Sequence, residues 1–93
     1  MREITAEDAA KEIRRAYDVA ATQHGGRAWT AIARLAERVD LTPAEMAEGI
    51  RHLARTDRRV VIVPESNQKT LTATARMYAV RYGGQDNHLI TWG

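Results

Sequence analysis

Residues 30–39 (TAIARLAERV) and 43–55 (PAEMAEGIRHLAR) stand head to tail in the middle of this 93-residue chain, separated by the tripeptide 40–42 (DLT). Both stretches repeat apolar residues at helical spacing, so each predicts a helix. Because the joint is so short, the two helices must cross at a steep angle. The β-branched run 59–63 (RVVIV) follows directly and predicts a strand.

The start of the segment 43–55 carries the clearest local signal in the chain. Thr42 can cap the helix, Pro43 fits its first turn, and Glu45 can reach back to the amide of the cap residue. The faces predicted to be buried are Ile32, Leu35, Ala36 and Val39 in the first segment, and Met46, Ala47, Ile50, Leu53 and Ala54 in the second.

A further helix is predicted upstream, over residues 5–24. Thr5 can cap it with Asp8 three residues on, and Gly25-Gly26 can end it. Its predicted buried stripe is Ala9, Ile13, Ala16, Tyr17, Ala20 and His24, with Glu7–Lys11 and Arg14–Asp18 spaced to pair on the other side. Because half of the stripe is alanine, we expect this helix to approach its neighbours, or a second subunit, closely.

Downstream of Val63, the sequence turns polar over residues 65–70. Thr72 can cap a short helix over 73–82, which Gly83-Gly84 would end. Residues 87–92 (NHLITW) predict a final strand that pairs antiparallel with 60–63. The connection between the two strands is too long for a tight hairpin and therefore contains the predicted helix.

Composition places this chain in the class of single-domain proteins. The chain has no cysteine, no apolar run near the ~20 residues that span a bilayer, and a charged N-terminus without a signal-peptide core. We therefore expect one domain over residues 1–93, in the cytoplasm and away from membranes. The net charge of +2 is mild for a protein that binds nucleic acid.

The basic residues are nevertheless unevenly placed. Arg51, Arg55, Arg58 and Arg59 crowd together with Asp57 as the one acid among them. The planar guanidinium group suits phosphate and carboxylate partners. The alternative is a solvated helix end, where the helix dipole favours cations. The sequence leaves both interpretations open.

Signals for catalysis or metal binding are weak. Ser66 is the one serine and lies in no Gly-x-Ser-x-Gly setting, and the paired glycines follow predicted helices rather than open them. Glu48 and His52 share a helix face, but no third ligand is in view, and His24 and His88 are distant in sequence. We expect no enzyme activity, no metal site and no cofactor, and we expect His88 to be a packed or hydrogen-bonded histidine.

The stretch from Trp29 to about Val63 resembles the winged helix-turn-helix superfamily of bacterial regulators. The residues that carry the resemblance are Ile32, Leu35, Ala36, Val39, Leu41, Thr42, Met46, Ile50, Leu53 and the run 58–61 (RRVV). The resemblance implies a mainly α fold with a small antiparallel β-sheet: a helix-turn-helix over 30–55 and wing strands over 59–63 and 87–92. It also implies a brief first strand at 27–29, where Trp29 would enter the core. The helix at 73–82 would be an insertion in the wing.

The resemblance implies a non-enzymatic DNA-binding protein, such as a bacterial, plasmid or phage transcriptional regulator. The segment 43–55 would enter the major groove of double-stranded DNA. The residues it places at the DNA are Arg27, Arg34, Ala44, Glu48, Arg51, His52, Arg55, Arg58, Arg59, Asn67, Gln68 and Lys69. A homodimer would let paired helices meet half-sites one turn of DNA apart.

Two acids oppose this interpretation. Glu45 and Glu48 near the start of the segment 43–55 would approach a phosphate lattice, although a glutamate can accept a hydrogen bond from cytosine. Both also have ordinary explanations, as a capping residue and as a surface partner of His52. The competing function is a winged helix protein–protein module in which Glu45, Glu48 and an exposed Trp92 serve a partner. A third interpretation makes the chain one domain of a larger assembly.

Overall fold

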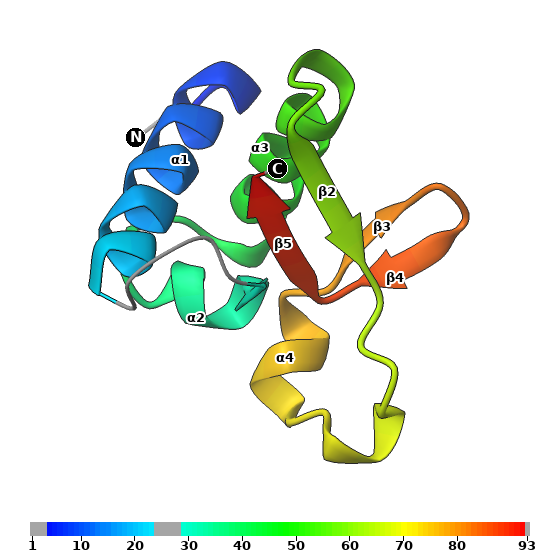
Figure 1. The fold of residues 1–93 in the computed structure, drawn as a ribbon. Coiled ribbons are helices and arrows are strands. Elements are labelled where there is room, and N and C mark those ends of the chain that lie inside the picture. Colours follow the sequence, from blue (N-terminus) through cyan, green and yellow to red (C-terminus); the bar gives the residue numbers. More distant parts are fainter. Residues whose placement is uncertain (1–3, 24–28, 93) are drawn as a thin grey trace.

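The computed structural model describes residues 4–23 and 29–92, which form a small α+β domain with a helical layer behind a small antiparallel sheet (Figure 1). Helix α1 (Ala6–Gln23) begins where the sequence predicts, and the Thr5 hydroxyl accepts a hydrogen bond of 3.1 Å from the amide of Asp8. Its predicted stripe is buried at Ala9, Ile13, Ala16, Tyr17 and Ala20. His24, Gly25 and Gly26 lie outside the described residues.

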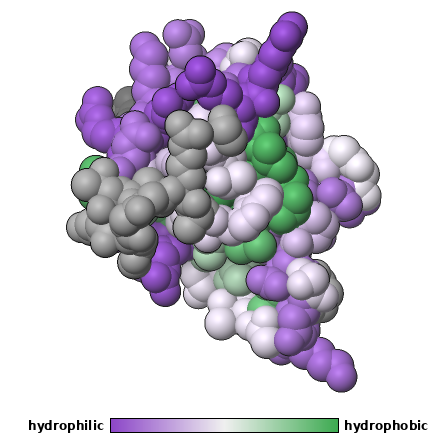
Figure 2. Space-filling model, viewed as in Figure 1, coloured by the Kyte–Doolittle hydropathy of each residue, from purple (hydrophilic) through white to green (hydrophobic). Residues whose placement is uncertain are grey.

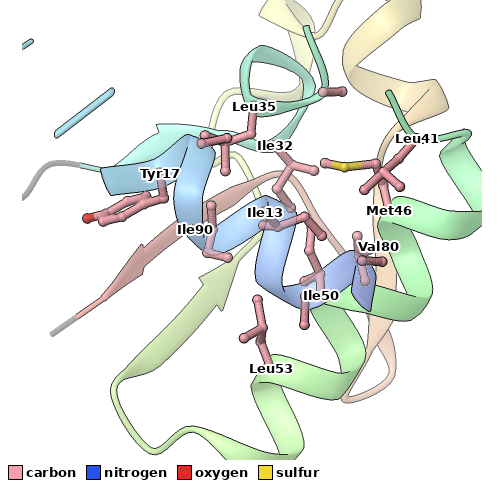
Figure 3. Close-up of a cluster of buried hydrophobic side chains, with 14 of the residues drawn as sticks. Ile13, Tyr17, Ile32, Leu35, Leu41, Met46, Ile50, Leu53, Val80 and Ile90 are labelled. Atoms are coloured by element: carbon pink, nitrogen blue, oxygen red, sulfur yellow. The ribbon is translucent and has the colours of Figure 1, made fainter. Parts of the chain in front are cut away.

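The small residues of α1 serve close packing against α3 (Pro43–Thr56) within the same chain. A Cβ on Gly49 would lie 2.7 Å from Cδ1 of Ile13 and 2.9 Å from Cβ of Ala9. Figure 3 shows Ile13 and Ile50 among the side chains that fill this core. Ala16 and Ala20 are 6% and 3% exposed, so the stripe is not a free surface for a second subunit.

The segment 30–39 forms two elements rather than one long helix. Thr30–Ala31 is strand β1, and only Ile32–Ala36 forms helix α2. The first residues pair with a distant strand, and this pairing outweighs their helical spacing. The predicted burial of Ile32, Leu35 and Ala36 is confirmed.

The start of α3 follows the predicted capping pattern. The Thr42 hydroxyl accepts a hydrogen bond from the Glu45 amide at 3.1 Å, and the Glu45 carboxylate accepts one from the Thr42 amide at 2.8 Å. Pro43 occupies the first turn. The reciprocal bonds satisfy amides that the helix itself leaves open.

The sheet has the strand order β1-β5-β2, and both pairings are antiparallel. Strand β2 (Val60–Val63) pairs with β5 (Leu89–Trp92) as predicted, with Val60 opposite Trp92. Because β1 has only two residues, it leaves Thr91 and Trp92 of β5 without a strand on that side, and the Tyr17 hydroxyl there accepts a hydrogen bond from the Trp92 amide at 3.4 Å.

The two tryptophans are placed opposite to expectation. Trp29, predicted in the core, is 51% exposed, whereas Trp92, predicted as an exposed end, is 5% exposed. The Trp92 ring lies against Tyr17 with a centroid distance of 4.6 Å, and its Nε1 donates to the Asp57 carboxylate at 3.0 Å. Strand alternation explains the burial of Trp92, because it turns Trp92 and Ile90 of β5 toward the helices. Trp29 lies outside the sheet, directly before β1.

The segment between β2 and β5 holds η1 (Gln68–Thr70), α4 (Ala73–Met77), β3 (Val80–Tyr82) and β4 (Gln85–Asn87). Thr72 caps α4 as predicted, but the helix does not extend to residue 82. Gly83 and Gly84, with φ angles of 65° and 79°, form the turn of a β3–β4 hairpin instead of ending a helix. The final strand therefore begins at Leu89 and not at residue 87.

Candidate nucleic-acid interface

Helix α3 presents a row of side chains on the side opposite its buried residues. Ala44, Glu48 and Arg55 are exposed, and Arg51 and His52 are partly buried. His52 lies toward α1, where it borders a shallow hollow with Lys11 and Arg14. The row is therefore open in its centre and flanked by α1 on one side.

Arg51 ties the other flank of α3 to the β3–β4 hairpin. Its Nε donates a hydrogen bond of 2.9 Å to the carbonyl oxygen of Arg81, and its terminal nitrogen lies 3.0 Å from the Glu48 carboxylate. Glu48 therefore pairs with Arg51 and not with His52 as expected. With its side chain 29% exposed and these partners made, Arg51 holds the hairpin beside α3.

The C-terminal end of α3 and the turn after it carry two cations that make no ion pair. Arg55 and Arg58 are exposed and make no ion pair within residues 4–23 and 29–92. The one acid of this segment, Asp57, is engaged by other groups. Its carboxylate accepts hydrogen bonds from the Arg59 amide at 2.9 Å and from Trp92 Nε1, and it lies 3.5 Å from Arg14. The backbone hydrogen bond from Arg59 is the main cause that lowers the pKa of Asp57 below its usual value.

The other residues predicted at the DNA lie elsewhere. Asn67 and Lys69 follow the far end of β2, on the opposite side of the molecule from the turn after α3 (Figure 1). The loop is ordered by its own bonds, because the Asn67 side-chain oxygen accepts from the Lys69 amide at 3.2 Å. Arg34 borders a groove between α2 and α4. Arg27 and the side chain of Gln68 lie outside the described part of the chain.

The sequence analysis missed Arg81 as a member of this surface. Arg81 is 64% exposed, pairs with Asp86 at 3.6 Å, and stands on the hairpin that flanks α3. The signal was present, since two glycines between two short strand-like runs are typical of a tight hairpin.

Within the described ranges, no three His, Asp or Glu side chains gather to hold a metal ion, and no helix has the length and apolar character to cross a bilayer. His88 is 7% exposed, and its Nδ1 accepts a hydrogen bond from the Glu65 amide at 3.1 Å, which confirms it as a packed histidine.

No protein-family model, curated protein or solved structure matches the chain.

Proposed function

We propose that the chain is a winged helix-turn-helix protein that binds double-stranded DNA through α3 as a non-enzymatic regulator. The observation that carries the proposal is topological. The element order α1-β1-α2-α3-β2-β5, with β5 between β1 and β2 in an antiparallel sheet, is the arrangement expected of that fold. The segment from η1 to β4 then stands where the wing would be.

The surface of α3 supports the same proposal. Ala44 is small and exposed, so the N-terminal part of the row is open to close approach by base edges. Arg55 and Arg58 at the other end suit phosphate contacts, since neither has an acid partner in the described residues. The carboxylate of Glu48 is partly compensated by Arg51 at 3.0 Å, which lessens its repulsion from phosphates.

The role of the wing falls to the β3–β4 hairpin in this proposal. Arg51 holds the hairpin beside α3, and its turn at Gly83-Gly84 is exposed. The loop with Asn67 and Lys69 stands apart from the α3 row, so we assign it no base contact. A protein partner stays the alternative, but the burial of Trp92 removes one of the three residues on which that interpretation rested.

Fluorescence anisotropy against a random-sequence duplex, at low and moderate salt, tests the proposal. We expect binding that weakens steeply with salt, because each arginine contact releases counterions. Arg55→Ala should flatten the dependence of log K on log salt by about one unit. Arg15→Ala, which removes the same charge from an exposed position on α1, is the matched control and should leave the slope unchanged. Salt-independent binding, or none, contradicts the proposal.

A further inference from the structure

The face of the sheet that points away from the helices is largely apolar and partly exposed. Strand alternation assigns to it Ala31, Val61, Val63, Leu89 and Thr91, because Ile90 and Trp92 face the helices. We call these five residues, together with Trp29 directly before β1, the outer sheet face; at its edge the Thr91 hydroxyl lies 3.2 Å from the Tyr17 hydroxyl of α1. None of them is buried: Trp29 is 51% and Val61 is 43% exposed. Figure 2 shows the apolar surface over β2.

This exposure is unusual for residues of this kind. A tryptophan and a β-branched strand row contribute most to stability when they leave water, so an uncharged face that contains them marks a contact surface. The face lies apart from α3, since no α3 residue belongs to it, and the DNA proposal does not use it.

The charges at the two ends of the face differ in sign. Arg59 precedes β2, is exposed, and continues the alternation of Val61 and Val63. At the other end, Ala31 and Leu89 form part of the wall of a groove of about 480 Å³ that Glu37, Glu65 and Arg34 also line. One end therefore carries Arg59, and the other is hollowed and carries two acids against one arginine.

We propose that a second copy of this chain docks on the outer sheet face in an antiparallel two-fold arrangement. The two apolar faces then cover each other with no charge at the centre. Arg59 of each copy meets the groove that Glu37 and Glu65 border on the other, because a two-fold axis makes the contact reciprocal. The face has six residues, against about 20–30 a side in a standard interface, so we expect a weak dimer that forms at micromolar to millimolar concentration.

Sedimentation equilibrium of the full chain without DNA tests this proposal. Val61→Lys should weaken self-association at least about tenfold, because it places a charge in a desolvated contact. Trp29→Ala should weaken self-association as well. Because this change introduces no charge, it still tests the proposal if Val61→Lys fails to fold. Val19→Lys is the matched control: Val19 is 45% exposed but stands on α1, so association should not change.

A charge exchange identifies the occupant as a second copy. Arg59→Glu and Glu37→Lys should each weaken the dimer, and the double variant should restore it, because both charges change sign together. Glu37 is preferred to Glu65, whose carboxylate also accepts a hydrogen bond from the Asn67 amide. A monomer at all concentrations, or a dimer indifferent to Val61→Lys and Trp29→Ala, overturns the proposal. Since no DNA is present, neither result bears on the function of α3.

Discussion

The Nε of Arg51 donates a 2.9 Å hydrogen bond to the carbonyl oxygen of Arg81, which joins the middle of α3 to the first strand of the β3–β4 hairpin. The two residues are thirty positions apart in sequence. The bond sets the position of the hairpin relative to the outward row of α3, so the shape of the candidate interface depends on it.

Replacing Arg51 with alanine should therefore loosen the hairpin. Loss of a hydrogen bond from a charged donor costs about 1.5–3 kcal/mol in a protected site and less here, because the Arg51 side chain is 29% exposed. We expect faster amide hydrogen exchange at Val80 and Tyr82, measured by NMR. Arg55 on the same helix makes no such bond, so Arg55→Ala serves as the control. Equal exchange rates in both variants would show that the Arg51–Arg81 hydrogen bond does not hold the hairpin.

Gly49 is predicted to resist substitution even though it lies inside a helix. Glycine to alanine in a helix interior normally stabilises by about 1 kcal/mol. Here the added Cβ would lie 2.7 Å from Ile13 Cδ1, so we expect Gly49→Ala to destabilise by roughly 1–3 kcal/mol in urea unfolding. Ile13→Val removes that methyl group, so adding it to Gly49→Ala should restore part of the lost stability. A stabilising Gly49→Ala would show that α1 and α3 are less closely packed.

Acid should destabilise the fold through Asp57. Its pKa is lowered in the folded protein below the usual 3.8, chiefly by the hydrogen bond from the Arg59 amide. The folded state thus favours the charged carboxylate, and this contribution is present above the unfolded pKa and lost as pH falls through the folded value. We expect thermal stability to fall below about pH 4 more steeply in the wild type than in Asp57→Asn. Asp86→Asn, which changes the same charge away from Trp92, should retain the wild-type slope.

Glu48 is predicted to weaken non-specific DNA binding. Glu48→Gln keeps the size of the side chain and removes one negative charge from the α3 row. We expect tighter binding to random duplex by about two- to fivefold at low salt, the range of one exposed charge interaction. Glu7→Gln on α1, where the carboxylate is likewise exposed and lies 3.9 Å from a cation, Lys11, is the matched control. If both variants bind DNA as the wild type does, α3 is not the contact surface.

The sequence predicts the helices better than the segment between β2 and β5. The capping pair Thr42 and Glu45, and the stripe from Ala9 to Ala20, follow local rules, and the structure confirms both. Thr30 and Ala31 depend instead on pairing with β5, about sixty residues away, which local spacing does not encode. Gly83-Gly84 fits both a helix end and a hairpin turn, and only the partner strand decides between them.

In the candidate site, too, local sequence places some residues correctly, whereas the position of others depends on tertiary contacts. Arg55 and Arg58 could be placed from helical spacing and from the turn that follows. The separation of Asn67 and Lys69 from α3 could not, because it depends on the direction in which β2 carries the chain. Arg51 was expected to meet phosphate, and its bond to Arg81 depends on a hairpin that the sequence analysis did not predict.

Amide chemical-shift mapping by NMR, with a random-sequence duplex added to the labelled full chain, tests the central claim most directly. If α3 binds DNA, the largest shifts should fall on Ala44, Glu48 and Arg55 and on the hairpin at Arg81, and they should fade as salt is raised. Val61, on the outer sheet face, should shift little. Shifts confined to the loop of Asn67 and Lys69, or no shifts at low salt, would contradict the account.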